Sequence, residues 1–320
     1  MVLLDIRELK VYYHSRIRGI VRAVDGVSLT LDRDESLGLV GESGSGKSTI
    51  AFALMRLLPN YAKISGKILF DGINLLEASE DFMRSIRGKR IALVPQDPFT
   101  SLDPLMRVGD QIAEAIIAHN PLMEKEDAKK LALEALEAVG IMKNRANDYP
   151  HQFSGGMRQR ALIAMAIALK PDLLIADEPT TALDVIVQAQ ILDLLKDLKK
   201  KLGLSIILIS HDISVIMQVS DKIAVMYAGK IVETAPSLTI AESPVHPYTK
   251  ALIRSVPNID TERQVFEAIP GQPPDLTNPP SGCRFHPRCP LAGNKCKTEE
   301  PPLVKIGEKH YVACWLYAKR

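Results

Sequence analysis

Gly41-Glu42-Ser43-Gly44-Ser45-Gly46-Lys47-Ser48-Thr49 is the most informative segment of this chain. It follows the short apolar run Leu37-Gly38-Leu39-Val40, which has the character of a β-strand. We expect a helix from Ile50 to Leu58, because this run has no internal breaker and stops at Pro59. A strand, a glycine-rich loop and a helix in this order are typical of a phosphate-binding loop (P-loop).

The loop has the groups needed to hold a triphosphate. Its glycines let successive backbone N–H groups turn toward one point, the helix N-terminus adds partial positive charge, and Lys47 adds a full one. Ser48 supplies a hydroxyl for Mg²⁺. A dinucleotide-binding fingerprint would need Gly or Ala where Thr49 stands, so we exclude it. The plain alternative is a glycine-rich turn with no ligand.

Composition limits the class of protein. A chain of 320 residues with 46% hydrophobic content can form a large globular domain plus an appendage. No apolar run approaches the roughly 18 residues of a spanning helix, and no basic region precedes an apolar one at the N-terminus, so we expect a cytoplasmic protein. A net charge of +2 without a basic stripe argues against a nucleic-acid partner.

Alternating apolar residues predict strands in the N-terminal third of the chain. We expect strands at Leu9–Tyr13, Val27–Leu31, Ser65–Phe70 and Arg90–Val94, with a basic loop from His14 to Arg22. Most of these form an antiparallel region. From Val108 to about Ala168 the pattern becomes helical, including an amphipathic helix over Lys125–Val139, and this predicts a helical insertion at about 100–168.

Strands then alternate with helices, which predicts a parallel sheet and an α/β fold. The expected elements are strands at Leu173–Ala176, Leu204–Ile209 and Ile223–Tyr227, and a helix over Val185–Leu202 that Gly203 closes. After Ala235 prolines become dense, so we place a domain boundary there. The domains are then 1–235 and a loop-like tail, 236–320, that buries little core.

Two acidic residues end a predicted buried strand, in Leu173-Leu174-Ile175-Ala176-Asp177-Glu178-Pro179. Neighbouring strand residues point in opposite directions, so the two carboxylates can have different roles. Asp177 can reach the Mg²⁺ shell, and Glu178 can orient an attacking water or accept its proton. The alternative, an exposed polar turn, is disfavoured because Thr180-Thr181-Ala182-Leu183-Asp184 follows directly.

The order of motifs over residues 1–235 resembles the ATP-binding subunits of ABC transporters. Ser154-Gly155-Gly156-Met157-Arg158-Gln159 is similar to the ABC signature, and Ala182-Leu183-Asp184 to the D-loop. Gln96 resembles the Q-loop glutamine and His211 the switch histidine. Tyr13 would be the aromatic residue that stacks on adenine, although a tyrosine simply packed in a strand is the alternative.

The resemblance implies a P-loop NTPase (RecA-like) core with an antiparallel β subdomain, a helical insertion and ATP hydrolysis in a head-to-tail dimer. It also implies roles that span two chains. Ser154 can cap a helix running to Leu169, so that its amino end, with Gly155, Gly156, Gln159 and Asp184, completes the partner's site. Gln96 would touch Mg²⁺ or water, and His211 can donate to the γ-phosphate.

Three further segments resemble the oligopeptide and dipeptide importer branch, and its D-type subunit in particular. They are Gln96–Pro104 followed by Val108–Ile112, then Pro244–Leu252, and the tail from Pro270–Leu276 to Cys314. This implies a paralogous ATP-binding subunit, two membrane permease subunits, an extracytoplasmic solute-binding protein, and a peripheral place on the cytoplasmic face of the membrane. Peptide is the expected cargo, but the branch also includes nickel and some oligosaccharide importers.

The four cysteines lie close together in the tail, at Cys283, Cys289, Cys296 and Cys314. In a cytosolic protein this favours metal ligation over disulfides. The spacing matches neither the common ferredoxin patterns nor paired zinc knuckles. Because some members of the branch with these cysteines resemble cluster binders, we favour a [4Fe–4S] cluster. Zinc, with His286 or His310 as substitute ligands, and reduced thiols remain the alternatives.

Two other classes of protein fit the motifs less well than an importer ATPase. A soluble ABC ATPase of translation or repair typically has two cassettes or a coiled-coil insertion, whereas this chain has one cassette and an importer-type tail. A P-loop kinase would leave Ser154–Gln159 without an explanation. Co-purification with membrane subunits separates the first alternative from the importer.

Overall fold

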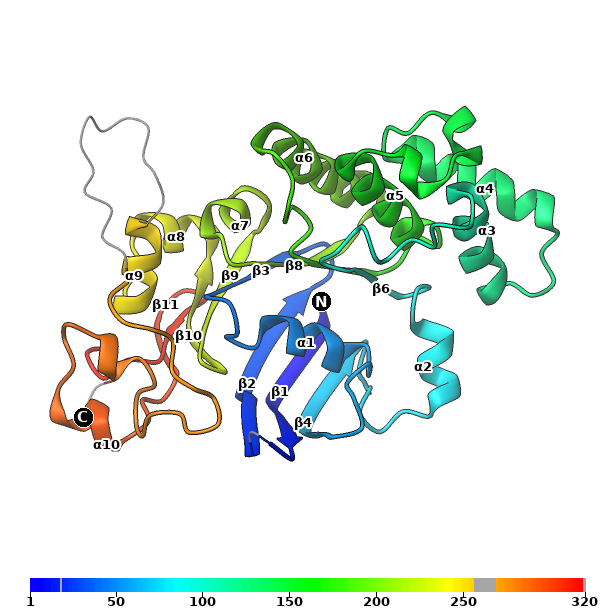
Figure 1. Ribbon diagram of the computed structural model, residues 1–320. Coiled ribbons are helices and arrows are strands. Elements are labelled where there is room, and N and C mark those ends of the chain that lie inside the picture. The colour runs from blue at the N-terminus through cyan, green and yellow to red at the C-terminus, as the bar shows by residue number, and fades with distance from the viewer. Residues whose placement is uncertain (18, 256–268, 319–320) are drawn as a thin grey trace. The chain divides into compact units, whose positions relative to one another are not determined.

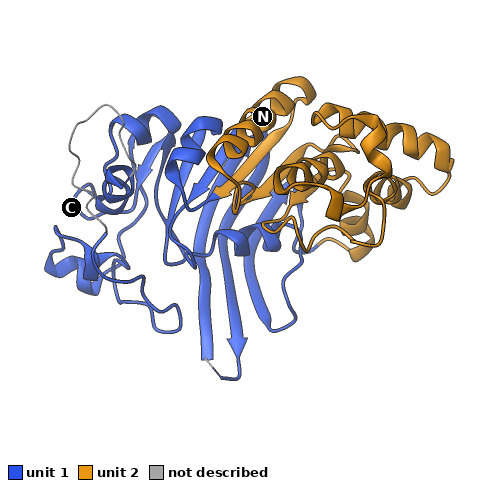
Figure 2. Cartoon of the chain, turned by 45° about the horizontal axis from the view of Figure 1, so that its top comes forward, with its two compact units in different colours: residues 1–32, 36–77, 210–320 blue, residues 33–35, 78–209 orange. Residues whose placement is uncertain are grey.

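The computed structural model describes residues 1–17, 19–255 and 269–318. The chain divides into two compact units, shown in blue and orange in Figure 2. The P-loop unit comprises Met1–Asp32, Ser36–Glu77 and Ser210–Arg320, and the acidic-strand unit comprises Arg33–Glu35 and Ala78–Ile209. This division does not test the boundary expected near residue 235, which stays a prediction.

An antiparallel sheet in the P-loop unit confirms the expected β region (Figure 1). Its strand order is β2-β1-β4-β5, with bounds β1 Val2–Ser15, β2 Gly19–Asp32, β4 Ala62–Phe70 and β5 Ile73–Asn74. The loop expected from His14 to Arg22 is wrong, because Ser15 of β1 pairs with Gly19 of β2. The strands of a hairpin can stay paired through backbone hydrogen bonds beyond the residues whose side chains are buried. Alternating apolar residues therefore do not mark the end of the pairing.

Five other strands of the P-loop unit lie in the order β11-β12-β10-β9-β3. Their bounds are β3 Ser36–Val40, β9 Lys222–Tyr227, β10 Lys230–Pro236, β11 Val304–Gly307 and β12 His310–Val312. β3 and β9 are parallel, and all five residues of β3 are buried, as the continuous apolar run predicts. The helices of this unit are α1 Lys47–Leu54, α7 Ile213–Val219, α8 Ser237–Glu242, α9 Pro247–Arg254 and α10 Asn294–Thr298.

Helix α1 ends at Leu54, four residues before the expected end. Arg56 takes a left-handed φ of 50°, and Leu57 N–H donates to the Phe52 carbonyl at 2.9 Å. Arg56 N–H donates to the Ala53 carbonyl at 3.0 Å, which completes a Schellman motif. Glycine usually fills the left-handed position of this motif, so an arginine there gives no signal in the sequence.

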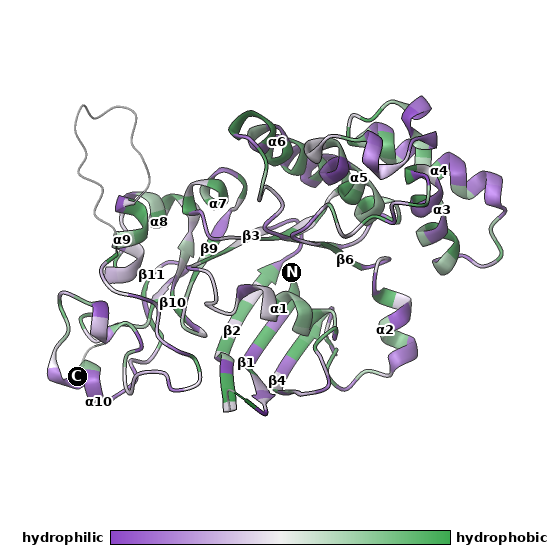
Figure 3. Ribbon diagram, viewed as in Figure 1, coloured by the Kyte–Doolittle hydropathy of each residue, from purple (hydrophilic) through white to green (hydrophobic). Residues whose placement is uncertain are grey.

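The acidic-strand unit has a parallel sheet in the order β8-β7-β6, as expected. The strands are β6 Ile91–Val94, β7 Leu173–Asp177 and β8 Ser205–Ser210. The helices are α2 Glu80–Ile86, α3 Val108–His119, α4 Lys125–Ala138, α5 Gly155–Ile167 and α6 Val185–Leu202. Helix α6 has the predicted bounds, and Gly203 ends it at a φ of 64°. The expected amphipathic helix is α4, along which hydrophilic and hydrophobic residues alternate in Figure 3.

The described part of the tail, residues 236–255 and 269–318, has more regular structure and more buried side chains than the sequence predicts. The expectation that it buries little core is wrong, because Tyr248, Phe285 and Val312 are at most 2% exposed. Strand β12 pairs with β10 and thereby joins the tail to the sheet. Burial here comes from aromatic rings gathered from separate segments, and periodicity does not detect such a cluster.

None of the described helices combines the length and the hydrophobicity that spanning a bilayer requires.

Candidate functional site

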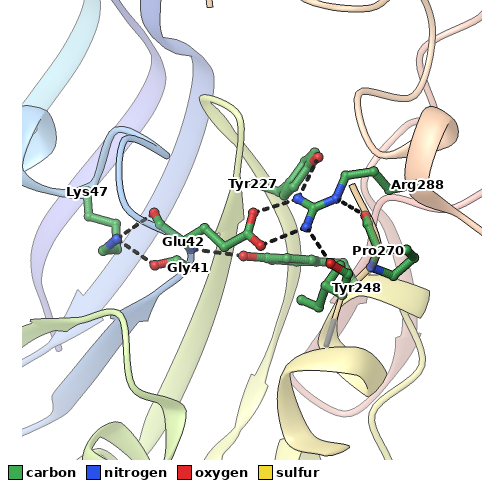
Figure 4. A network of polar contacts seen from close by, with 8 residues as sticks. Gly41, Glu42, Lys47, Tyr227, Tyr248, Pro270 and Arg288 are labelled. Carbon is green, nitrogen blue, oxygen red and sulfur yellow. Dashed lines mark hydrogen bonds and ion pairs between the residues drawn. The ribbon is translucent and has the colours of Figure 1, made fainter. Parts of the chain in front are cut away.

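Lys47 is held inside the P-loop. It is the first residue of α1 and only 5% exposed, and its Nζ donates to the carbonyls of Gly41 at 2.6 Å and Glu42 at 2.9 Å (Figure 4). An ammonium beside a helix N-terminus is a favourable place for a phosphate group. The strand, loop and helix expected from the sequence are all present.

Gly46 allows the loop to pass close to β2. A Cβ on this residue would lie 2.1 Å from the Ala23 carbonyl oxygen, and its φ of 105° is left-handed. Gly46 is also the N-cap of α1, so it is the residue at which the loop turns into the helix. Both the space and the dihedral angle therefore require glycine at this position.

Tyr13 lies beside the last residue of the P-loop. Its hydroxyl donates to Thr49 Oγ1 at 3.3 Å, and its ring centroid is 6.0 Å from that of Tyr61. Its neighbour Tyr12 instead donates to Asp25 at 2.5 Å. The structure thus brings Tyr13, and not Tyr12, to the nucleotide loop, while its stacking on adenine stays a prediction.

In the acidic-strand unit, Glu178 sits immediately after β7 in a strained conformation. Its φ is 46°, which is uncommon for a residue with a long side chain and costs about 1–3 kcal/mol. Its Oε2 accepts hydrogen bonds from Gln96 Nε2 at 3.1 Å and Thr181 Oγ1 at 2.9 Å. Because β6 and β7 are parallel neighbours, Gln96 and Glu178 follow the same edge of the sheet. Asp177, the last residue of β7, is 4% exposed.

The signature segment begins helix α5, as expected. Ser154 is the N-cap and its Oγ accepts from Met157 N–H at 3.3 Å, although the helix ends at Ile167 and not at Leu169. A Cβ on Gly156 would lie 2.5 Å from Val187 Cγ1, so this glycine lets α5 pack closely on α6.

The structure also places two other residues of the predicted partner-facing set, Asp184 and Gln159. Asp184 caps α6, accepting from Ile186 N–H at 3.1 Å and Val187 N–H at 3.0 Å. Gln159 is 1% exposed, so its side chain does not face solvent in this conformation. Their contacts with a second nucleotide stay a prediction.

The predicted site residues fall into two groups. The P-loop unit contains Tyr13, Gly41, the run 43–49 and His211, which is exposed between β8 and α7. The acidic-strand unit contains Gln96, Ser154, Gly155, Gly156, Gln159, Asp177, Glu178 and Asp184. Within these groups the structure joins Tyr13 to the P-loop and Gln96 to Glu178. Thr181, which we did not predict as a site residue, also contacts Glu178.

The four cysteines gather in one region of the tail. Cys283 N–H donates to the Cys296 carbonyl at 2.8 Å. Burial, with a smaller contribution from the charges of Cys296, Cys314 and Cys289, raises the pKa of the Cys283 thiol to about 11. Burial also raises the pKa of Cys289 and Cys314. Nevertheless, no group of three or more His, Cys, Asp or Glu side chains in the described residues is arranged to hold a metal ion.

Comparison with known proteins identifies the family. Residues 24–181 match the family model described as ABC transporter, and residues 232–296 match the model of the oligopeptide/dipeptide transporter C-terminal region. The chain is 50% identical over 320 residues to the oligopeptide transport ATP-binding protein OppD of Bacillus subtilis (strain 168), covering 98% of this chain and 88% of that relative. The chain belongs to the ABC transporter family.

Other similar proteins agree with this assignment. The dipeptide transport ATP-binding protein DppD of Lactococcus lactis subsp. cremoris is 47% identical over 320 residues, covering 99% of this chain and 91% of that relative. A dimeric ATP-binding cassette in a post-hydrolysis state with ADP and phosphate is 29% identical, with a TM-score of 0.65, covering 73% of this chain and 98% of that one. The predicted class, a transport ATPase of the oligopeptide and dipeptide branch, is confirmed.

Proposed function

We propose that this chain binds and hydrolyses ATP to energise the uptake of dipeptides or oligopeptides through a membrane importer. The observation that carries the proposal is the match to the peptide-transport ATP-binding protein OppD, 50% identical over 98% of this chain. The second matched segment, residues 232–296, supports the peptide branch in particular. Oligosaccharide or nickel is the alternative cargo.

Each predicted site residue has a proposed role in hydrolysis. The loop amides and Lys47 hold the phosphates, Tyr13 stacks on adenine, and His211 donates to the γ-phosphate. Ser48 and Asp177 would hold Mg²⁺, with Gln96 near the ion or the attacking water. Glu178 orients this water and accepts its proton. The strained backbone of Glu178 and its bond to Gln96 support this assignment, because strain of this kind clusters at functional sites.

The working unit in this proposal is a head-to-tail pair of cassettes. The amino end of α5, with Ser154, Gly155, Gly156, Gln159 and Asp184, would complete the γ-phosphate site of the partner subunit. The dimeric cassette bound to ADP and phosphate, to which this chain is similar, supports the arrangement. The partner would be a paralogous ATP-binding subunit.

The assembled importer would place this chain on the cytoplasmic face of a membrane. It would act beneath two permease subunits, which receive solute from an extracytoplasmic binding protein, and it would bind no nucleic acid. In this organisation residues 1–235 are the ATPase domain, with the helical subdomain at about 100–168, and 236–320 are an accessory domain.

For the cysteines we propose a [4Fe–4S] cluster, with zinc as the alternative metal. Cys283, Cys289, Cys296 and Cys314 are a soft thiolate donor set, which suits either metal. Cys314 is buried and the other three are half-buried. Their side chains would have to rearrange to bind it. Iron and acid-labile sulfide in an anaerobic preparation would support the cluster, whereas a colourless preparation that retains zinc would exclude it.

The function is tested by co-expression with candidate permease subunits and reconstitution in lipid vesicles. The proposal expects this chain to co-purify with the permeases and to drive ATP-dependent accumulation of a labelled peptide. Labelled oligosaccharide and nickel are the matched controls for cargo. Stable ATPase activity without any association with membrane subunits would favour the soluble ABC ATPase instead.

A further inference from the structure

Glu42, inside the P-loop, is where the nucleotide loop meets the C-terminal tail (Figure 4). Its carboxylate receives two hydrogen bonds from Arg288, one from Nη1 at 2.7 Å and one from Nη2 at 2.9 Å. Its backbone N–H donates to the Tyr248 hydroxyl at 2.9 Å. The tail therefore contacts both the side chain and the main chain of a P-loop residue.

Glu42 is also one of the two residues, with Gly41, whose carbonyls accept hydrogen bonds from the P-loop lysine. Its carbonyl oxygen accepts from Lys47 Nζ at 2.9 Å and from Ser45 N–H at 3.1 Å. The tail thus contacts the backbone N–H and the carboxylate of Glu42, and Lys47 contacts the carbonyl oxygen of the same residue. A displacement of Glu42 would move an acceptor of the Lys47 ammonium with it.

Arg288 is well fixed for a positioning role. Its side chain is 6% exposed, and its Nε donates to the Pro270 carbonyl at 2.8 Å. A further bond from Nη1 reaches the Tyr227 hydroxyl at 3.3 Å. Because Nη1 and Nη2 of Arg288 each bond to one oxygen of the Glu42 carboxylate, they fix its orientation as well as its distance.

Tyr248 is fixed by packing. It lies in the first turn of α9 and is fully buried. Its ring centroid is 4.7 Å from that of Tyr227 and 5.3 Å from that of Phe285. Packing against Tyr227 of β9 and Phe285 of the tail therefore fixes the position of the Tyr248 hydroxyl, which accepts from Glu42 N–H.

We propose that Arg288 and Tyr248 are positioning residues for the P-loop, holding Glu42, and with it an acceptor of Lys47, in the conformation that receives the triphosphate. Arg288 has a second effect, because it neutralises a carboxylate that would otherwise repel the bound phosphates. The tail thus acts on nucleotide affinity and not on the chemical step. The inference rests on the proposed function, since it requires that the P-loop bind ATP.

The test is a nucleotide titration and a steady-state ATPase assay on the full chain with Arg288→Gln. We expect the Kd and KM for ATP to rise about tenfold, which corresponds to about 1.4 kcal/mol, while kcat at saturating ATP stays within about twofold. Arg288→Lys should recover part of the affinity, because it restores the charge without the fork. Tyr248→Phe, which removes only the hydroxyl, should raise the Kd a few-fold.

Two controls separate positioning from simple loss of stability. In the double variant Glu42→Gln/Arg288→Gln, the Kd should be no higher than in Glu42→Gln alone, because the two residues act as one contact. Lys305→Gln, which removes an exposed tail cation on β11, should leave the Kd unchanged.

A wild-type Kd in folded Arg288→Gln, or additive losses in the double variant, would overturn the proposal. If Arg288→Gln does not fold, Arg288→Lys and Tyr248→Phe decide the matter, and wild-type affinity in both of them overturns it. Failure of the unmodified chain to bind ATP would instead contradict the proposed function.

Discussion

Glu178 is the residue on which hydrolysis depends in this account. Its left-handed backbone directs the carboxylate toward Gln96 and Thr181, at the edge where β6 and β7 both end. We predict that Glu178→Gln lowers the steady-state ATPase rate by roughly 10²–10⁴-fold, because an amide cannot accept the proton of the attacking water. ATP should still bind and hold the cassette dimer closed. A near-wild-type rate in this variant would contradict the role of Glu178.

Lys47 has a different role, which predicts a different defect. Removing its charge in Lys47→Ala removes charge-assisted hydrogen bonds worth about 1.5–3 kcal/mol, so the affinity for ATP should fall roughly 10- to 100-fold. An equilibrium titration with a fluorescent ATP analogue measures this loss. Unchanged affinity would mean that the loop does not bind phosphate as proposed.

At the residue scale, the sequence predicts the groups of the P-loop because one short segment carries them all. The contacts of Glu42 are different. Arg288 lies 246 positions further along the chain and Tyr248 lies 206 positions further, so only the tertiary fold brings them to the loop. The left-handed backbone of Glu178 is equally invisible in the sequence, because glutamate is not a residue that marks such a conformation.

At the element scale, the close approach of α5 and α6 depends on Gly156. In Gly156→Ala the new Cβ would lie 2.5 Å from Val187 Cγ1, so the helices must separate or Val187 must shift. We predict a loss of about 1–3 kcal/mol in the free energy of unfolding, measured by urea denaturation. Adding Val187→Ala should restore part of it.

Gly155→Ala is the matched control for this prediction. Its new Cβ would lie 3.3 Å from a methyl group of Leu183, which can yield by a few tenths of an ångström. This variant should therefore lose less stability than Gly156→Ala. Equal losses in the two variants would contradict the contact with α6 as the cause, because replacing Gly by Ala favours the helix at both positions and cannot itself lower stability.

Element boundaries show which signals the sequence contains. Helix α6 has the predicted bounds because a capping aspartate, Asp184, and a terminating glycine, Gly203, stand at its ends. Helix α1 ends early because Arg56 fills the left-handed position that glycine usually takes. The ends of a helix were therefore predictable where the usual capping residues mark them, as in α6. The end of α1 was not, because only the backbone conformation of Arg56 marks it.

At the scale of the whole molecule, the tail is attached to the sheet through the buried side chain of Glu233. Glu233 is 0% exposed and accepts hydrogen bonds from His310 Nε2 at 2.8 Å and from His246 N–H at 2.9 Å. We predict that His310→Ala lowers the free energy of unfolding by about 1–3 kcal/mol, because it leaves a buried carboxylate short of a donor. His310→Gln, which keeps a donor, should lose less. Equal stability of His310→Ala and the unmodified chain would contradict this attachment.

If ATP hydrolysis by this chain drives solute import, delivery of solute must control the ATPase rate of the assembled importer. The decisive measurement is the ATPase rate of the reconstituted importer, containing this chain, its paralogous partner and both permeases, with and without peptide-loaded binding protein. We expect loaded binding protein to raise the rate several-fold and Glu178→Gln in this chain to abolish the increase. A rate that ignores the loaded binding protein, or an increase that survives Glu178→Gln, would contradict it.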